Sequence, residues 1–329
     1  MKALSVTALT GPDALELTEI PEPIDDGSGV IVDMVYGGVS FPDLLQTKGM
    51  YQIRPDPPFT PGVEGSGIVR SAPADSGFSA GDRVAVWGMG VHAEVYRARP
   101  EQLFVIPPQM TLAEGAAFVL NYQTAMFCAV DRGNLRAGES VLVMGAAGGV
   151  GTSAIQVARG MGAGPIIGLV SSEAKAEVAL SAGADHAVLV SDTWKDDVVA
   201  LTGGRGVDMT YDPVGGDRFL DGLRCLARGG RLVVVGFAAG EIPTVKVNRL
   251  LLRNVSVVGA AWGEAASADP GLAPDIHRRL LPMVESGVVK PPIGEIFPFE
   301  RAVDAFRSLD DRTATAKVLV AIRADLAGL

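Results

Sequence analysis

One glycine-rich stretch, residues 139–162, constrains the fold of this chain more than any other part of its sequence. It begins with an apolar run, Val141-Leu142-Val143-Met144, and continues through a turn that holds four glycines. After this turn, apolar residues recur at spacings of three and four as far as Met161, which is the pattern of one face of a helix. The stretch therefore predicts a buried strand, a tight turn and a helix, in that order.

The glycines of this turn follow a spacing related to the dinucleotide-binding fingerprint. Glycines at such positions allow the backbone to approach a pyrophosphate, and the helix N-terminus offers N–H groups and the positive end of its dipole to that anion. A second apolar run, 165–170, follows at the distance of a βαβ unit, which favours a cofactor site over a turn that binds nothing. The predicted cofactor-binding residues of the turn are Gly145, Gly148, Gly149, Val150 and Gly151.

The composition narrows the class of protein. The 329 residues suffice for about two domains, and 48% of them are hydrophobic, so a large core can be buried. A net charge of −10 with scattered basic residues disfavours nucleic acid or a membrane as partner. No apolar run is long enough to span a bilayer and the N-terminus lacks the apolar core of a signal peptide, so we expect a soluble, cytoplasmic protein. Two cysteines and three widely spaced histidines predict neither a disulfide framework nor a metal site.

The order of the predicted elements indicates an α/β protein with two domains. Residues 1–122 contain short strands separated by turns, with a helical passage over 112–131. Residues 139–262 alternate apolar strands with helices, which is typical of a doubly wound parallel sheet. Residues 263–329, beginning with a loop rich in Ala and Pro, are too few for a core of their own. We predict one domain from 1–122 and 263–329, and a second from 123–262.

The ends of the predicted strands supply further candidate residues. Ligands of parallel sheets lie beyond the carboxyl ends of the strands, where the glycine turn also lies. The candidates at these ends are Ser171, Ser172, Gly236, Phe237 and Trp262.

Several further motifs occur in order along the chain. They are Gly37-Gly38-Val39-Ser40-Phe41-Pro42-Asp43, Gly49-Met50-Tyr51, Pro61-Gly62-Val63-Glu64-Gly65-Ser66-Gly67, Gly81-Asp82-Arg83-Val84, Asp212-Pro213-Val214-Gly215-Gly216 and Gly229-Gly230-Arg231. Together with the glycine turn, this order resembles the zinc-free quinone oxidoreductases (zeta-crystallin-like) of the medium-chain dehydrogenase/reductase superfamily. The resemblance implies a GroES-like domain built from both termini and a Rossmann domain, in agreement with the pattern of elements.

The resemblance also implies chemistry without a metal. The alcohol dehydrogenase branch of the superfamily places a zinc-binding Cys and His at the positions of Ser40 and Val63. The chain has no cysteine before Cys128, so the cysteines of that branch's structural zinc lobe have no counterpart here. Without this Lewis acid, zinc-assisted oxidation of an alcohol is not expected. The expected reaction is hydride transfer to a quinone or to an α,β-unsaturated carbonyl compound, an enone.

The expected cofactor is NADPH rather than NADH. NAD-binding Rossmann domains usually carry Asp or Glu at the end of the second strand, but this strand ends in Ser171-Ser172 and Lys175 follows. Similar NADPH enzymes have a small residue and a lysine there, which suit a 2′-phosphate. The alternative is that Glu173 binds the ribose and that Lys175 is an ordinary surface lysine.

Tyr51 is the candidate catalytic residue. It lies in a polar, Pro-rich loop and matches the G-x-Y position at which related enoyl thioester reductases have a proton-donating tyrosine. The alternative is a tyrosine that lines the substrate cleft without donating. The resemblance also places Ser40 near the nicotinamide and Thr124 on the nicotinamide side of the cleft. Asp43, at the start of a predicted helix, is interpreted as a helix cap or a structural partner rather than a base.

Three functions and one assembly follow from these patterns. The first function is an NADPH-dependent quinone or enone reductase that acts on a small molecule; the alternatives are an enoyl thioester (acyl-CoA) reductase and a non-catalytic NADPH-binding protein. The apolar stretch 254–259 is predicted to be an edge strand of the Rossmann sheet, which pairing with its twin would cover. Relatives dimerise in this way, so we expect a homodimer.

Overall fold

The computed structural model describes residues 1–328, which divide into two compact units. Unit 1 contains Met1–Leu120 and the chain from Pro291 onward, and unit 2 contains Asn121–Lys290. The predicted boundary between 262 and 263 is therefore corrected to 290/291. The predicted boundary between 122 and 123 moves to 120/121. The reason is that the segment after 262 packs on unit 2, where Arg279 Nη2 lies 2.6 Å from Asp131 Oδ1.

Unit 1 is built on a seven-stranded sheet. The strand order is β14-β15-β3-β4-β5-β7, β6 also pairs with β3, and β1 and β2 form a separate two-stranded sheet. The strands are β1 Lys2–Val6, β2 Leu15–Glu19, β3 Val30–Val39, β4 Glu64–Ser71, β5 Arg83–Trp87, β6 Val95–Ala98, β7 Leu103–Val105, β14 Ile293–Pro298 and β15 Lys317–Ala321. The helices are α1 Phe41–Thr47, α2 Leu112–Gly115 and α11 Ala302–Asp310, and α3, Val119–Ala125, spans the unit boundary.

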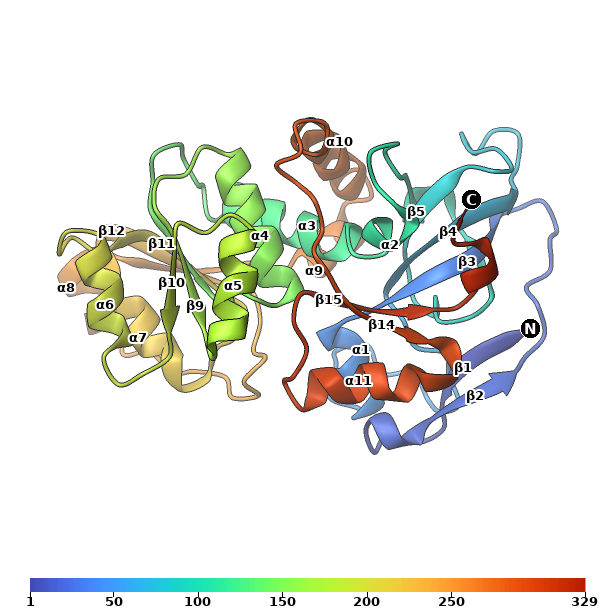
Figure 1. The fold of residues 1–329 in the computed structure, drawn as a ribbon, viewed down its shortest axis with the longest axis horizontal. Helices are drawn as coiled ribbons and strands as arrows, with labels where there is room; N and C mark the ends of the chain where they lie inside the picture. Colours follow the sequence, from blue (N-terminus) through green and yellow to red (C-terminus); the bar gives the residue numbers. More distant parts are fainter. Residues whose placement is uncertain (329) are drawn as a thin grey trace. The chain divides into compact units, whose positions relative to one another are not determined.

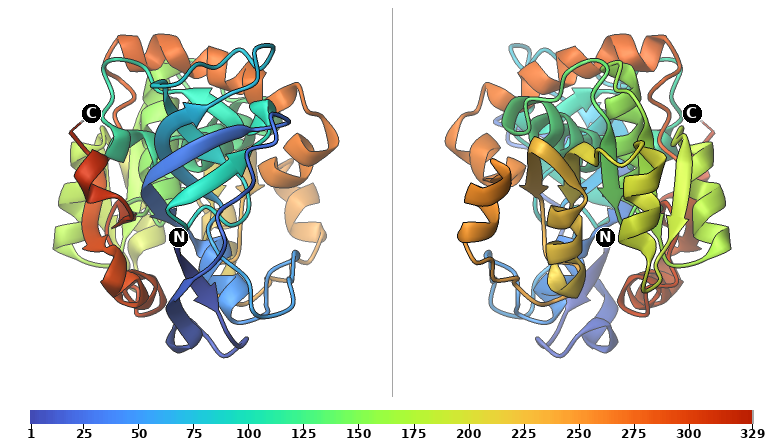
Figure 2. Two further views of the ribbon diagram at one scale, coloured as in Figure 1. Left: turned by 90° about the vertical axis from the view of Figure 1, so that its right-hand side faces the viewer. Right: turned by 90° about the vertical axis from the view of Figure 1, so that its left-hand side faces the viewer.

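The C-terminal segment completes the sheet and core of unit 1. Strand β15 runs antiparallel to β3, with Val318 opposite Val39 and Val320 opposite Gly37. Figure 2 shows this red C-terminal segment beside the blue N-terminal strands. Phe299 and Phe306 from the same segment are buried with residues of β1 and β3 in one hydrophobic cluster. The two ends of the chain thus share one core, as expected for a region too short to bury its own.

Unit 2 is a six-stranded parallel sheet with the strand order β10-β9-β8-β11-β12-β13. Figure 1 shows α4 and α5 side by side next to the sheet. The strands are β8 Val141–Met144, β9 Ile166–Val170, β10 His186–Leu189, β11 Val207–Asp212, β12 Leu226–Val234 and β13 Ser256–Gly259. The helices are α4 Gly149–Gly160, α5 Glu173–Ser181, α6 Trp194–Leu201, α7 Phe219–Arg224, α8 Asn248–Arg253, α9 Trp262–Ala268 and α10 Leu272–Glu285, with a π-helical segment over Met126–Arg132. The doubly wound parallel sheet is confirmed.

Some elements differ from the sequence prediction. The segment predicted as an Ala- and Pro-rich loop begins with helix α9, because alanine is a strong helix former and the chain reaches Asp269-Pro270 only after two turns. The short helix α8 was not predicted, since its three consecutive leucines do not show helical periodicity. In these two segments, the helical conformation depends on tertiary contacts rather than on a local sequence pattern.

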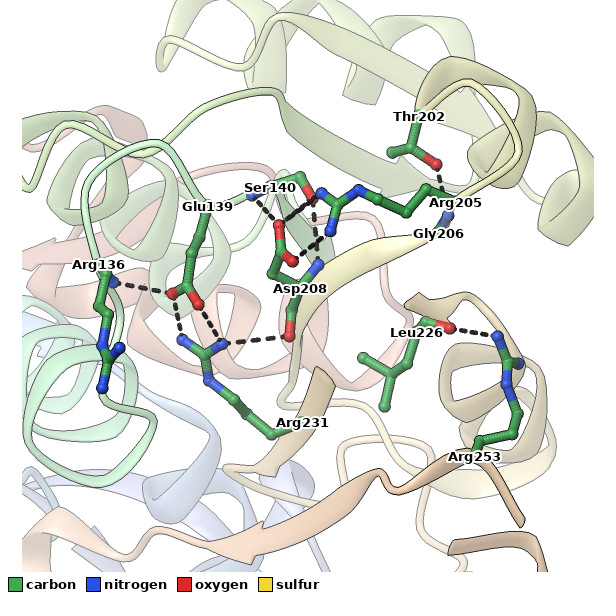
Figure 3. Close-up of polar contacts among 10 residues, drawn as sticks. All are labelled: Arg136, Glu139, Ser140, Thr202, Arg205, Gly206, Asp208, Leu226, Arg231 and Arg253. Atoms are coloured by element: carbon green, nitrogen blue, oxygen red, sulfur yellow. Dashed lines mark hydrogen bonds and ion pairs between the residues drawn. The ribbon is translucent and has the colours of Figure 1, made fainter. Parts of the chain in front are cut away.

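A network of charged side chains closes the amino end of the parallel sheet (Figure 3). Arg205 makes a two-pronged ion pair with Asp208 at 2.5 and 2.7 Å, and the N–H and hydroxyl of Ser140 both donate to Asp208 Oδ2 at 2.8 Å. Arg231 pairs with Glu139 at 2.9 and 2.6 Å. The hydrogen bonds from Arg205 hold the pKa of Asp208 well below its usual value. The network joins β11 and β12 to the residues that precede β8.

Candidate active site

The carboxyl edge of the parallel sheet collects most of the residues that the sequence predicted for the cofactor. Gly145 follows β8, Ser171 follows β9 and Gly236 lies two residues after β12. These three strands are parallel, so their carboxyl ends lie at the same edge. The structure therefore brings the glycine turn, the Ser171-Ser172 pair and the Gly236-Phe237 pair to one rim.

The glycine turn has the geometry of an anion-binding strand-to-helix turn. Helix α4 begins at Gly149, and its first-turn N–H groups lack intrahelical acceptors, as at any helix start. A side chain at position 151 is excluded, because a Cβ there would lie 2.2 Å from the carbonyl oxygen of Gly145. Gly148 is exposed at the same turn. The turn therefore fits the pyrophosphate of a dinucleotide.

Asn121 is a residue of this region that sequence reasoning missed. It is buried in α3, and a Cβ on Gly149 would lie 2.8 Å from its amide nitrogen. Its backbone oxygen accepts a hydrogen bond from the hydroxyl of Ser153 in α4 at 3.0 Å. The available signal was a polar amide within the helical passage predicted over 112–131. Asn121 thus sets the position of α3 against the start of α4.

The end of β9 forms a polar corner at the start of α5. The side chain of Ser172 caps this helix and accepts a hydrogen bond from the N–H of Lys175 at 3.4 Å. Ser171, Ser172 and Glu173 are exposed, and Lys175 is half-buried in the first turn. Hydroxyl groups, a helix N-terminus and an ammonium group on one turn can together bind an anion.

The other candidates on unit 2 have different environments. Phe237 is 37% exposed in the loop after β12, and this loop bonds to the loop after β11 through the N–H of Ala239 and the oxygen of Val214 at 2.9 Å. Thr124 is half-buried in α3. Trp262, predicted at a strand end, is the first residue of α9 and is buried.

Unit 1 contains a buried polar cluster at the end of β3. The Ser40 hydroxyl donates to Glu64 Oε1 at 3.1 Å and accepts from Lys317 Nζ at 2.6 Å. Lys317 also forms an ion pair with Glu64, and the side chains of both residues are almost fully buried. Only Ser40 of this set was a predicted site residue. A lysine at the head of the apolar strand Lys317–Ala321 was the signal for the cluster.

Asp43 lies next to this cluster and acts as the predicted helix cap. Its Oδ2 accepts the backbone N–H of Ser40 at 2.8 Å, and Ser40 is the N-cap of α1. Oδ1 is buried and has no hydrogen-bond partner among residues 1–328. Burial raises the pKa of Asp43 from 3.8 to about 7, although the charge of Lys317 opposes the rise.

His92 packs against the same strand and is a neutral core residue. Its Nε2 lies 3.2 Å from the carbonyl oxygen of Gly38, and burial lowers its pKa to about 4. No group of three or more His, Cys, Asp or Glu side chains in residues 1–328 could hold a metal ion.

Tyr51 lies in unit 1, four residues after α1. It is half-buried, and its backbone oxygen accepts a hydrogen bond from Arg54 Nε at 3.0 Å. The structure thus places Tyr51 and Ser40 in unit 1 at opposite ends of α1, whereas the glycine turn, the Ser171-Ser172 corner and Thr124 belong to unit 2.

The combination of a β-rich unit completed by both termini and a parallel sheet with a glycine turn defines the fold of a medium-chain oxidoreductase. Residues 26–108 match the alcohol dehydrogenase GroES-like domain family, and residues 149–276 match a family described as zinc-binding dehydrogenase. The chain is 37% identical over 326 residues to quinone oxidoreductase-like protein 2 of Rattus norvegicus, a match that covers 98% of this chain and 92% of that protein.

Solved structures give the same classification. A probable oxidoreductase from Mycobacterium abscessus matches with a TM-score of 0.90 and 42% identity over 98% of both chains. The quinone oxidoreductase from Thermus thermophilus, whose complex with NADPH was also solved, matches with a TM-score of 0.83 and 34% identity over 98% of this chain and 100% of that chain. The chain belongs to the medium-chain dehydrogenase/reductase superfamily and, within it, to the zinc-free quinone oxidoreductase family. No helix in residues 1–328 is long and apolar enough to cross a membrane.

Proposed function

We propose that this protein is an NADPH-dependent oxidoreductase that reduces a quinone or an enone without zinc. The observation that carries the proposal is the glycine turn at the start of α4, on the carboxyl edge of a parallel sheet. The names of the rat and Thermus relatives support the reaction class, and the NADPH complex of the Thermus protein supports the cofactor.

The residues present fit the cofactor in three places. The turn from Gly145 to Gly151 would bind the pyrophosphate through backbone N–H groups. Ser171, Ser172 and Lys175 would bind the 2′-phosphate, with the ammonium group neutralising part of its charge. Thr124, on the same unit as the glycine turn, would contact the nicotinamide. When bound, NADPH supplies the hydride, and the protein supplies orientation and a dry environment.

The residues do not fit a catalytic zinc ion, although one matching family is named for zinc binding. Zinc sites in proteins use Cys, His or carboxylate ligands. At the two positions where the resemblance expects ligands, Val63 has no donor atom and the hydroxyl of Ser40 already bonds to Glu64 and Lys317. The acceptor must therefore be a compound that gains a hydride without metal activation, such as a quinone or an enone.

The test follows NADPH absorbance while the pure protein meets an ortho-quinone, a simple enone and a short enoyl-CoA. Oxidation with the quinone or the enone supports the proposal, and oxidation with the enoyl-CoA alone would replace it with an enoyl thioester reductase. Tight NADPH binding without oxidation by any of the three would favour a non-catalytic binding protein. Repeating the assay with NADH and with Lys175→Ala tests the cofactor assignment, which predicts that the variant loses NADPH affinity and keeps NADH affinity.

We also propose a homodimer that forms through the edge of the parallel sheet. Strand β13 pairs with β12, and no strand in residues 1–328 pairs with its other side. Helix α8, which directly precedes β13, exposes Leu251 and Leu252 at 74% and 71%. A second copy would pair with the open strand edge and cover the leucines.

A further inference from the structure

We propose that Asp212 is a positioning residue of the cofactor site, because its carboxyl group fixes the loop 213–216 between the glycine turn and the loop that carries Phe237. This inference rests on the proposed function, since it names the residue that shapes the cofactor site of that function. All the residues that carry it belong to unit 2.

Asp212 ends a central strand of the parallel sheet. Strand β11 pairs with β8 on one side and with β12 on the other, and its last residue, Asp212, is 1% exposed. The glycine turn follows β8, and Gly236 lies two residues after β12. Because the three strands are parallel, Asp212 lies at the same edge, between these two parts of the candidate site.

The carboxyl group of Asp212 fixes the backbone that follows it. Its Oδ1 accepts hydrogen bonds from the N–H groups of Val214 at 2.8 Å and Gly215 at 2.9 Å. Aspartate favours such turns because its side chain can bond to the backbone two residues further on. Gly215 and Gly216 continue the turn with φ angles of 64° and 63°, which glycine adopts without steric cost. The position of the loop 213–216 is therefore set by one side chain.

This loop supports the glycine turn on one side. Cγ2 of Val214 lies beside Gly145, where an added Cβ would be 2.9 Å from it. Gly145 has a φ of 63° and is the first glycine of the turn. A displaced Val214 would remove the packing beside this glycine, and the N–H groups that follow would lose their fixed direction.

The loop 213–216 also holds the loop after β12. The N–H of Ala239 donates to the carbonyl oxygen of Val214 at 2.9 Å. A Cβ on Gly215 would lie 3.0 Å from Cδ1 of Phe237, so the phenyl ring packs directly on the loop. Through this one loop, the Asp212 side chain determines where both the glycine turn and Phe237 lie.

The two oxygens of Asp212 have different surroundings, which indicates the variants to compare. Oδ1 has two donors, whereas Oδ2 is buried and has no hydrogen-bond partner in the part of the chain that the structure describes. Burial also raises the pKa of this carboxyl group. Asparagine keeps one acceptor oxygen and removes the buried charge, whereas leucine keeps the branched shape and has no acceptor. Positioning of the loop requires only the acceptor.

The test compares Asp212→Asn and Asp212→Leu with Thr210→Val as the matched control. Thr210 is buried in the same strand, and its hydroxyl donates to the carbonyl oxygen of Gly222 at 3.1 Å. The readouts are the NADPH Kd from fluorescence titration, the melting temperature and the hydrogen exchange of the Ala239 amide.

We expect Asp212→Leu to weaken NADPH binding at least about tenfold, the effect of about one lost hydrogen bond, and to speed the exchange of the Ala239 amide. Asp212→Asn should keep the Kd within about threefold of the unmodified value, because the acceptor is retained. Thr210→Val should lower the melting temperature and change neither the Kd nor the exchange, because its hydrogen bond does not reach the loop.

Two outcomes overturn the inference. The first is an Asp212→Leu variant that binds NADPH as tightly as Thr210→Val, and the second is an Asp212→Asn variant that binds it as weakly as Asp212→Leu. If Asp212→Leu does not fold, Val214→Ala removes the methyl group beside Gly145 and should weaken NADPH at least about threefold, whereas an unchanged Kd would also overturn the inference. Failure of the proposed function looks different: the unmodified protein would oxidise no NADPH with any acceptor, while the Kd and exchange comparisons would still decide the role of Asp212.

Discussion

At the scale of single residues, burial decides what each polar group can do. Tyr51 is half-buried in a loop, whereas Asp43 is fully buried beside Glu64 and Lys317. A half-buried phenol can contact a substrate. A buried carboxyl group with one unpartnered oxygen instead lowers the free-energy cost of burying its charge by taking up a proton. We therefore predict an effect on turnover for Tyr51 and an effect on the pH dependence of stability for Asp43.

Replacing Tyr51 by Phe tests the proton donor. Reduction of an enone requires a proton at the substrate, so we expect turnover of an enone to fall by about 100-fold or more if the phenol supplies it. A quinone product takes its protons from water, so turnover of an ortho-quinone serves as the control and should stay within about twofold. Equal enone turnover by the Tyr51→Phe variant and the unmodified protein would show that Tyr51 does not donate the proton and at most lines the substrate site.

Asp43 predicts a pH dependence of stability. Its pKa rises from 3.8 when unfolded to about 7 when folded, so between these values only the folded state holds the proton. The free energy of unfolding therefore falls as pH rises through this window, by up to about 1.4 kcal/mol per pH unit, and levels off above it. Asp43→Asn imitates the protonated form and should remove this fall.

Urea unfolding at pH 5, 6, 7 and 8 measures the effect as the difference between variant and unmodified protein. This difference is needed because His92 acts in the opposite direction: its folded pKa of about 4 lies below its ordinary 6.5, so it makes the fold more stable as pH rises from 4 to 6.5. A variant whose stability curve runs parallel to that of the unmodified protein would refute the assignment to Asp43.

At the scale of elements, the two ends of the parallel sheet have separate roles. The carboxyl edge carries the glycine turn, and the amino edge carries the network of Arg205, Asp208, Arg231 and Glu139 (Figure 3). At the carboxyl edge, the glycines leave room for the backbone to lie close to a ligand. At the amino edge, ion pairs hold the strands and the preceding residues together. We therefore expect substitutions at the amino edge to change stability without changing cofactor affinity, and substitutions at the carboxyl edge to change cofactor affinity.

Two glycines of the turn should respond differently to alanine. Gly151→Ala places a Cβ 2.2 Å from the Gly145 oxygen, so it should lower both the melting temperature and NADPH affinity. Gly148 has ordinary φ and ψ angles of −84° and 170°, and its nearest contact to a new Cβ is at 3.6 Å. Gly148→Ala should keep the melting temperature but weaken NADPH at least about tenfold, because its methyl group meets the pyrophosphate. Calorimetry and NADPH titration give both quantities, and tight NADPH binding by the Gly148 variant would contradict the proposed contact.

Glu139→Gln should lower stability without touching the cofactor site. The side chains of Glu139 and Arg231 are only 24% and 14% exposed, so the lost charged hydrogen bonds should reduce the free energy of unfolding by about 1–3 kcal/mol. Glu300→Gln is the matched control, because the Lys2–Glu300 pair is exposed and 3.5 Å apart and should change stability by less than about 0.5 kcal/mol. Denaturant unfolding measures both variants. A large change in NADPH affinity with Glu139→Gln would show that the two edges are not independent.

At the scale of the whole molecule, the open edge of unit 2 predicts assembly. The double variant Leu251→Glu/Leu252→Glu changes two exposed side chains, so the fold should persist while the proposed interface loses its apolar contacts. Sedimentation velocity should give twice the 34.1 kDa chain mass for the unmodified protein and 34.1 kDa for the variant at micromolar concentration. Leu180→Glu on α5, where the leucine is 45% exposed, is the control and should sediment like the unmodified protein. An unmodified protein that sediments as a monomer would refute the dimer.

The sequence by itself determined the parts of this protein that depend on local spacing. The strand, turn and helix around Gly145–Gly151 follow from hydrophobic periodicity and glycine spacing. The capping role of Asp43 follows from its place near the start of a predicted helix. The fold-back of the last strands also followed, since a short segment cannot bury its own apolar face.

Only the tertiary structure decided the rest. The second unit boundary lies at 290/291 because α9 and α10 pack on unit 2, and no local pattern encodes which of two cores a helix joins. The bonds among Ser40, Glu64 and Lys317 link residues up to 277 positions apart. Such pairs form when β3, β4 and β15 become neighbours in one sheet, because strand pairing, and not sequence spacing, sets which side chains meet.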